Sequence, residues 1–360
     1  MNERRLAFAA LIVALAGCAA VAPERDSGFA AVSATVGERT GRDVARLDDS
    51  DGGGATTRSI RALIGEGLAA DEAVEIALLN NRELQAVYTD LDVAQSDLVQ
   101  SSLLHNPVAD VVAGFPVGGG MVDLSFGVAL DVIDLLYVPL RKRVASARFE
   151  ETKLRVAGQV LDLAWRTQTA FHEHQADEQM LEMRRQVAAS TAASSELARR
   201  MREAGNSTEL ELASEQALAE EAKLELRLAE VEARESRERL NSLMGLWGEE
   251  AGAWQAAPAR LPDPSLESPD VERLESRAVE RSLDLAAAER LIVAAGENLG
   301  LDRASALFPE LVVGGGAERD GPEWEPGPTL TLALPFFDRG QARIARARAE
   351  LRRARELRPF

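Results

Sequence analysis

The sequence of 360 residues is short of several features on which other proteins rely. Cys18 is its only cysteine, so no disulfide can form within the chain. Its 41 basic residues are outnumbered by 59 acidic ones, and the net charge of −18 argues against a nucleic-acid partner. Its apolar run from Leu6 to Ala16 is too short to cross a bilayer as a helix.

Residues that could carry catalysis or bind metal are also scarce. His172 and His174 flank Glu173, but residues two apart on a helix face different ways and cannot bind one ion together. We expect both to be packed or solvated helix residues, and His105 to sit at a helix end. Gly314–Gly316 lack the following helix and lysine of a phosphate cradle. No serine, histidine and acid arrangement stands out, so we predict no enzyme, no metal and no cofactor.

The N-terminus predicts export. Arg4 and Arg5 precede the apolar run, and small residues follow it, as in a secretory signal over residues 1–17. The quartet Leu15-Ala16-Gly17-Cys18 resembles the lipobox of bacterial lipoproteins, which implies cleavage before Cys18, acylation of its thiol by groups such as palmitate, and attachment to lipid. The alternative is an ordinary signal peptide with an incidental Cys18. Residues 18–70 read as a lipid-anchored linker, because the stretch from 22 to 67 is rich in Gly, Ser, Thr and Asp.

The rest of the chain contains a repeat. The stretch from His105 to Glu150 has a second copy from Phe308 to Glu350, and upstream Leu84 answers Leu285 at a separation of 201. Each copy encodes a pair of strands. We therefore predict a first helix-strand-strand-helix repeat over residues 71–253, a proline-rich connector over 254–270, and a second repeat over 271–360.

The strands are predicted from alternation with a period of two. One apolar face is expected to contact lipid, with these residues: Val122, Leu124, Phe126, Val128, Leu130, Leu330, Leu332 and Leu334. Partner strands run over 108–115 and 311–318, the latter weakened by Gly314–Gly316. A strand of about 9–11 residues has the length that crosses a bilayer in a tilted barrel.

Helices flank the strands. We predict one from Asp71 to the Asn106-Pro107 stop, a second from Pro139 to Glu203, a third capped by Ser207 or Thr208, and a fourth over 271–307. Trp165 and Phe171 are expected to pack. The third helix carries two apolar seams with a period of seven: Leu210, Ala217, Leu224 and Val231 form one, and Leu212, Ala219, Leu226, Ala233 and Leu240 form the other. Two seams on nearly opposite flanks are typical of a helix in a wall with a neighbour on each side.

Four strands are too few to close a barrel, and open strand edges are not tolerated in lipid. A lipid-facing sheet of this kind therefore requires sister subunits. Three copies would supply twelve strands.

The order of these elements resembles the TolC-like outer membrane efflux proteins. The resemblance is carried by four stretches: 77–86 (ALLNNRELQA), 103–107 (LLHNP), 203–206 (EAGN) and 332–338 (LALPFFD). It implies an α+β membrane protein with long antiparallel α-helical coiled-coil hairpins and four β-strands per chain in a trimeric, 12-stranded outer-membrane β-barrel. It also implies a passive exit duct that docks with a periplasmic adaptor and an inner-membrane pump, with Gly205 and Asn206 at the adaptor-contact tip. Residues 243–247 (LMGLW) favour the heavy-metal efflux branch.

One departure from the family concerns the C-terminus. The family has a second long helical hairpin after the fourth strand, whereas twenty residues follow Gly340 here, so the resemblance implies a C-terminally truncated chain. Two alternatives to a working duct stay open. One is a structural periplasmic coiled-coil lipoprotein, and the other is a non-functional truncated fragment of an efflux duct.

Overall fold

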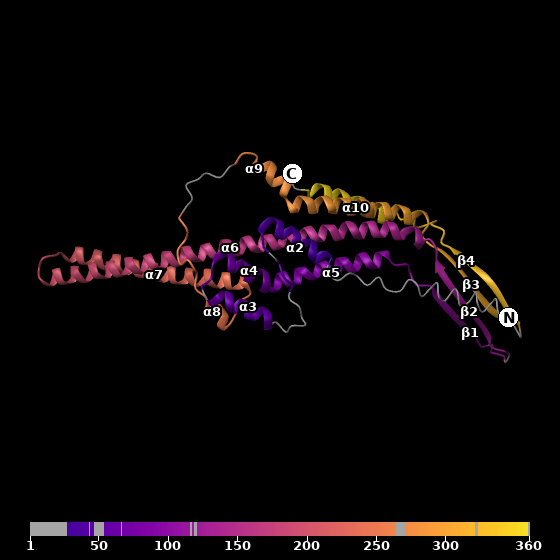
Figure 1. The fold of residues 1–360 in the computed structure, drawn as a ribbon, viewed down its shortest axis with the longest axis horizontal. Helices are drawn as coiled ribbons and strands as arrows, with labels where there is room; N and C mark the ends of the chain where they lie inside the picture. Colours follow the sequence, from indigo (N-terminus) through magenta and orange to yellow (C-terminus); the bar gives the residue numbers. More distant parts are fainter. Residues whose placement is uncertain are drawn as a thin grey trace. The chain divides into compact units, whose positions relative to one another are not determined.

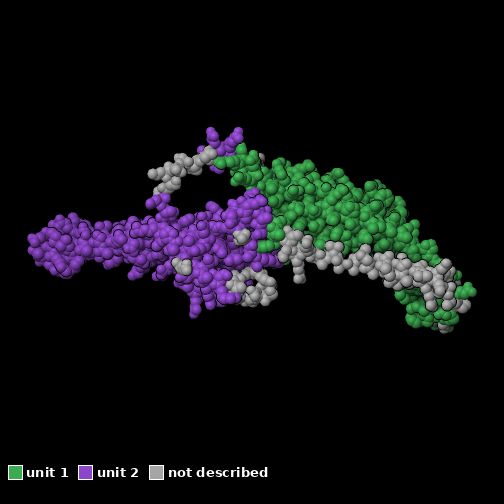
Figure 2. Space-filling view, in the orientation of Figure 1, with its two compact units in different colours: residues 1–32, 89–156, 275–360 green, residues 33–88, 157–274 purple. Residues whose placement is uncertain are grey.

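The computed structural model describes residues 27–42, 44–46, 54–65, 67–115, 117–118, 121–263, 271–320 and 323–358. The predicted signal peptide and the Cys18 anchor lie outside these residues and stay predictions. The chain divides into two compact units, each described by itself (Figure 2). Unit 1 comprises Met1–Val32, Thr89–Val156 and Glu275–Phe360, and unit 2 comprises Ser33–Tyr88 and Ala157–Leu274.

Helices dominate both units, and several pass from one to the other (Figure 1). Their bounds are α2 (Ser27–Thr40), α3 (Gly54–Gly65), α4 (Ala70–Asn80), α5 (Arg82–Ser102), α6 (Asp134–Glu203), α7 (Glu209–Met244), α8 (Glu249–Ala253), α9 (Leu274–Arg281), α10 (Leu283–Leu307) and α11 (Gln341–Glu356). The strands are β1 (Val108–Gly114), β2 (Asp123–Asp131), β3 (Leu311–Asp320) and β4 (Glu323–Leu332).

The four strands of unit 1 form one antiparallel sheet in the order β1-β2-β3-β4 (Figure 1). The predicted strand pairs are confirmed, and β2 pairs with β3, so the two repeats share one sheet. Gly314–Gly316 do not interrupt β3, contrary to expectation, because each pairs in register with both neighbouring strands. The glycines lack side chains but keep the backbone groups on which a strand ladder depends.

The repeat extends to the way its helices begin. The helix expected to run without a break from Asp71 divides at Asn81, whose Oδ1 accepts a hydrogen bond from the Leu84 amide at 2.9 Å. The helix expected over 271–307 divides at Ser282, whose Oγ accepts from the Leu285 amide at 3.1 Å. These caps are 201 residues apart, 282 minus 81, which is the separation of the sequence repeat. Helix propensity alone does not reveal such a break, because the cap replaces the lost helical bond.

Helix α6 is longer than predicted. It starts at Asp134 rather than Pro139, and its 70 residues extend about 105 Å. Pro139 lies inside the helix rather than in its first turn. Helix α7 begins at the predicted cap, Thr208, and ends at Gly245, which adopts φ 67°. A Cβ on Gly245 would lie 2.7 Å from the Asn80 carbonyl oxygen, so glycine permits this close approach.

The predicted tether is wrong where the structure describes it, because helices α2 and α3 lie within residues 18–70. Val32 and Val36 on α2 are buried, as are Ile60 and Ile64 on α3. Each pair is spaced four residues apart, as on one face of a helix. The abundant Gly and Ser of the flanking sequence hid this short apolar period.

The first residues of the predicted connector belong to unit 2. Trp254 is fully buried, and its indole Nε1 donates to Asn241 Oδ1 at 2.8 Å. Leu68 donates to the Gln255 carbonyl at 2.8 Å and accepts from the Ala257 amide at 2.8 Å. This part of the connector is therefore held against the N-terminal segment of unit 2, while residues 264–270 lie outside the description.

Candidate functional site: a two-faced sheet and a helical hairpin

The strand register places most of the apolar strand residues on one face of the sheet. Strand alternation and cross-strand pairing together define this apolar face, which is made of Ala109, Val111, Ala113, Leu124, Phe126, Val128, Leu130, Leu311, Val313, Gly315, Ala317, Arg319, Trp324, Pro326, Pro328, Leu330 and Leu332. Arg319 is the only charged residue among these described positions. Val111, Phe126, Val128 and Leu330 are more than half exposed, so the described chain leaves this face largely uncovered.

The structure brings together most of the residues expected to contact lipid. Six of them lie on the apolar face, four on β2 and two on β4. Val122 lies one residue before β2, and Leu334 lies two residues after β4 with its side chain exposed. Val111 of β1 and Val313 of β3 also lie on this face; they were not among the residues expected to contact lipid, although the same alternation marks them.

The opposite face is mostly polar and acidic, although Val108, Val112 and Val312 also belong to it. Its residues include Asp110, Asp123, Ser125, Asp131, Glu318, Glu323, Glu325, Thr329 and Thr331. A row of small residues crosses its middle, where Gly127 pairs with Gly316 and Gly316 pairs with Gly327. A Cβ on Gly127 would lie 2.6 Å from Asp110 Oδ1. Glycine thus lets the Asp110 carboxylate lie close to the backbone of the neighbouring strand.

The free edge of β4 carries two prolines that the sequence analysis did not place in a strand. The Ala333 amide donates to the Glu310 carbonyl at 3.3 Å, and hydrogen-bonded pairs alternate with non-bonded pairs along an antiparallel ladder. Pro326 and Pro328 therefore occupy non-bonded pairs with β3, and their nitrogens face the outer edge. Proline is tolerated in a sheet at such edge positions.

The two seams of α7 lie in different surroundings. Ala219, Ala233 and Leu240 of one seam are buried, and Ala233 packs with Leu181 of α6 within unit 2. Leu210, Leu224 and Val231 of the other seam are 77%, 62% and 48% exposed. The described residues cover one of the two predicted seams, and a neighbour on the other seam stays a prediction.

The predicted tip lies between α6 and α7. Gly205 has φ 79°, its amide donates to the Arg202 carbonyl at 3.0 Å, and the Asn206 amide donates to the Met201 carbonyl at 2.8 Å. These two bonds form a Schellman motif, which ends α6 and requires a left-handed residue at Gly205.

The start of α7 completes the reversal. Thr208 Oγ1 accepts from the Glu211 amide at 3.2 Å, and Glu211 Oε2 accepts from the Thr208 amide at 2.8 Å, which is a capping box. The Thr208 amide and the Ser207 hydroxyl hold the pKa of Glu211 below its usual range. Met201, Leu197 and Leu210 are exposed around this tight turn, so a rigid reversal presents apolar side chains.

Comparisons with known proteins agree with this geometry. No family model matches the chain. The pyoverdine export outer membrane protein OpmQ of Pseudomonas putida is 34% identical over 155 residues, which are 41% of this chain and 32% of that relative. The chain thus matches about a third of that curated relative's length.

Solved structures match a larger share. A membrane protein from Pseudomonas aeruginosa aligns with a TM-score of 0.61 and 22% identity over 79% of this chain and 71% of that one. The Campylobacter jejuni CmeC outer membrane channel aligns with a TM-score of 0.65 and 15% identity over 80% and 66%. The chain has the TolC-like fold. The predicted resemblance and fold class are confirmed. OpmQ and CmeC are outer membrane proteins, as the predicted location requires.

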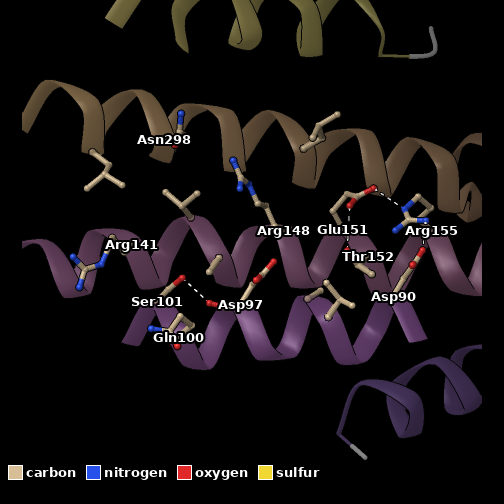
Figure 3. Close-up of a pocket in the computed structure, with 16 residues that line it drawn as sticks. Asp90, Asp97, Gln100, Ser101, Arg141, Arg148, Glu151, Thr152, Arg155 and Asn298 are labelled. Carbon is tan, nitrogen blue, oxygen red and sulfur yellow. Dashed lines mark hydrogen bonds and ion pairs between the residues drawn. The ribbon is translucent and has the colours of Figure 1, made fainter. Parts of the chain in front are cut away.

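Within the TolC-like fold, unit 1 contains a groove of about 710 Å³ between α5, α6 and α10. Arg155 lies 3.2 Å from Asp90 and 3.5 Å from Glu151, and Figure 3 shows its side chain directed toward both carboxylates. Leu291 and Leu301 contribute apolar lining from α10. Paired charges and aliphatic side chains line the groove, as is typical of a junction between helices.

The start of α6 contains a carboxylate that is held in its charged form. Asp134 is nearly buried; it pairs with Arg141 and accepts from the His105 amide at 3.0 Å. The hydrogen bond from Arg141 is the largest cause that lowers the pKa of Asp134 to about 2. His105 therefore lies near a helix end, as expected. Its ring Nδ1 also lies 3.0 Å from Asp134 Oδ2.

The remaining histidines have structural surroundings. His174 is buried, with Nδ1 3.2 Å from Ser236 Oγ and its ring against Trp254. Burial lowers the pKa of His174, an effect opposed by nearby Glu178. His172 contacts Gln175 Oε1 at 3.0 Å, so the two rings have different partners, as expected.

Two aromatic predictions differ in outcome. Phe171 is buried, whereas Trp165 is 65% exposed, so its predicted packing is wrong for the described chain. Helix periodicity places a residue on a face but does not determine whether that face is covered.

The described residues contain no group of three His, Cys, Asp or Glu arranged to hold a metal ion. None of the described helices is long and apolar enough to cross a membrane.

Proposed function

We propose that this chain is the outer-membrane exit duct of a tripartite efflux system. It forms a passive channel for small solutes or metal ions, and an inner-membrane pump supplies the energy. The proposal is supported by the TolC-like fold, by the export function that the name of OpmQ states, and by a sheet with one apolar and one mostly polar face.

The single observation that carries the proposal is the uncovered, two-faced sheet. Strands β1 and β4 have unpaired outer edges within the described chain, and the apolar face is largely exposed. In lipid every backbone polar group needs a partner, so open edges must be closed by further strands. Three copies supply twelve strands, a number suited to a closed barrel with its polar face toward water.

The helical hairpin fits the same assembly. The exposed seam of α7 offers Leu210, Leu224 and Val231 to a neighbouring copy, while its other seam packs against α6. Three such hairpins form a periplasmic wall in this proposal. A periplasmic adaptor would engage the tip at Gly205 and Asn206, where exposed Met201 and Leu197 provide apolar contact.

Three measurements test the proposal. The protein extracted in detergent is expected to have the mass of a trimer, and the purified trimer is expected to conduct ions across a planar bilayer. Lipid labelling is expected in the intact chain and not in Cys18→Ala. A water-soluble monomer without conductance would contradict the duct.

Protease accessibility separates the duct from a structural coiled-coil lipoprotein. In a duct, β1–β4 are shielded by lipid and resist cleavage in intact membranes. In a coiled-coil lipoprotein the same strands face water and are cut. The helical tip should be accessible from the periplasm in both cases, so it serves as the positive control for cleavage.

A further inference from the structure

One cation interrupts the apolar face of the sheet. Arg319 occupies the last apolar-face position of β3 and pairs across the ladder with Trp324 of β4. The acidic neighbour Glu318 belongs to the opposite, polar face. An arginine paired with a tryptophan at one end of a lipid-facing surface is typical of the level where hydrocarbon meets headgroups.

The height of the apolar face agrees with this placement. Leu332 and Trp324 are eight positions apart, 332 minus 324, which corresponds to about 27 Å along the strand. At a strand tilt of about 40° the rise across the membrane is about 21 Å, close to the apolar band of an outer-membrane barrel. Phe308, Phe336 and Phe337 are exposed beyond the other end of the face. Aromatic side chains thus mark both boundaries, and the cation lies at one of them.

Next to this cation the apolar face is hollowed. An open hollow of about 570 Å³ is lined by Phe126, Gly314, Gly315, Gly316, Ala317, Pro326, Gly327 and Pro328. Phe126 and Trp324 come from strands on either side of β3, and their ring centroids lie 5.5 Å apart. Phe126 pairs with Ala317, and Trp324 pairs with Arg319, so the two rings meet diagonally across β3, where Ala317 has a small side chain. The hollow exists because residues on this part of β3 and β4 have small or short side chains.

We propose that this end of the sheet binds one phosphate-bearing membrane lipid, with its phosphate at Arg319 and an acyl chain in the hollow. Arginine forms strong charge-assisted hydrogen bonds with phosphate oxygens. The indole of Trp324 suits the boundary between headgroup and hydrocarbon. The hollow supplies the apolar contact that free phosphate cannot use. The inference rests on the proposed function, because it requires the apolar face to contact lipid.

Native mass spectrometry of the detergent-solubilised trimer tests the inference. Three probes are compared: phosphatidic acid, diacylglycerol with the same acyl chains, and inorganic phosphate alone. We expect phosphatidic acid to be retained best. Arg319→Gln is expected to reduce its retention about fivefold, the effect of one cation near an anionic surface. Glu318→Gln, a neighbour on the polar face, is the matched control and should not reduce retention.

A second variant tests the hollow without changing charge. A Cβ on Gly315 would meet only the Gly327 carbonyl oxygen, at 3.7 Å, so the backbone accepts a side chain there. Gly315→Leu fills the hollow and is expected to reduce retention of phosphatidic acid, while Gly315→Ala has a smaller effect. Reduced retention of phosphatidic acid in each of the variants Arg319→Gln and Gly315→Leu supports a single lipid site.

The outcomes separate the inference from the proposed function. Equal retention by the wild type and Arg319→Gln overturns the lipid site even if the trimer conducts, and so does retention of inorganic phosphate as strong as that of phosphatidic acid. Equal retention of diacylglycerol also overturns it, because the phosphate then contributes nothing. Absence of a membrane-inserted trimer in the wild type would instead reject the proposed function.

Discussion

The hairpin of α6 and α7 and the four-stranded sheet obtain their stability in different ways. The hairpin buries one of its two seams within its own unit, through contacts such as Leu181 with Ala233. Neighbouring strands of the sheet are hydrogen-bonded to one another. Within the described chain, however, its apolar face is largely exposed and the outer edges of β1 and β4 are unpaired. The hairpin can therefore form from one chain, whereas the sheet needs lipid and other strands.

The largest effect is expected from a substitution that removes packing contacts from the covered seam. Leu240 is fully buried, so Leu240→Ala is expected to lower the free energy of unfolding by about 3 kcal/mol through lost burial and a residual cavity. Leu224 on the exposed seam is the matched control, and Leu224→Ala should change the stability of the dissociated chain by less than about 0.5 kcal/mol. Urea unfolding followed by circular dichroism measures both. Equal losses of unfolding free energy in the two variants would show that both seams contribute equally to the stability of a single chain.

A charge on the apolar face of the sheet tests its contact with lipid. Leu330→Arg is expected to disfavour membrane insertion by about 2–4 kcal/mol, because a guanidinium would enter hydrocarbon. Thr331→Arg places the same charge on the polar face and should be tolerated. The inserted fraction is measured by refolding into vesicles across a urea series. Similar insertion of both variants would contradict the assignment of the two faces.

The ion pair at the start of α6 predicts a pH dependence. The pKa of Asp134 falls from 3.8 to about 2 on folding, so its contribution is present above about pH 4 and is lost as the pH falls toward 2. Asp134→Asn should cost about 2 kcal/mol at neutral pH and remove this acid dependence. Asp162→Asn, which breaks an exposed pair with Arg166, should cost less than about 1 kcal/mol. Denaturant titrations at several pH values measure how the free energy of unfolding depends on pH.

Backbone strain at the tip should have a smaller effect. Gly205 has φ 79°, so Gly205→Val is expected to cost about 1–2 kcal/mol. Asparagine tolerates the left-handed region better, and Gly205→Asn should retain most of the stability. Thermal unfolding compares the two variants. An equal loss of stability in both variants would mean that side-chain contacts, and not the backbone angle, cause the loss.

The smallest effect concerns the buried histidine of unit 2. Burial lowers the pKa of His174, so the unfolded chain binds more protons and stability falls as the pH drops below the ordinary histidine value. The positive charge of Arg237 opposes protonation of His174, whereas the charges of Glu178 and Asp177 favour it. His174→Gln should flatten the change in melting temperature between about pH 7.5 and pH 5.5. His172→Gln, which changes the neighbouring histidine at a less buried site, is the matched control.

Sequence reasoning succeeded where a local pattern has a single physical meaning. Alternation predicted the apolar side of β2, and the turn residues after Glu203 predicted the end of α6. It failed where distant groups decide the outcome. Asn81 ends α4 because its side chain also bonds to the Leu243 carbonyl, 162 residues away. Trp165 occupies a helix face that the described chain does not cover.

The sequence alone determined the repeat, the strand faces and the two seams of α7, because periods of two and seven follow from backbone geometry. Tertiary structure decided which seam is covered, placed Pro326 and Pro328 on a free edge, and joined the two repeats by pairing β2 with β3. The physical reason is that a period orients a side chain relative to its own backbone. Its partner is selected by parts of the fold that are remote in sequence.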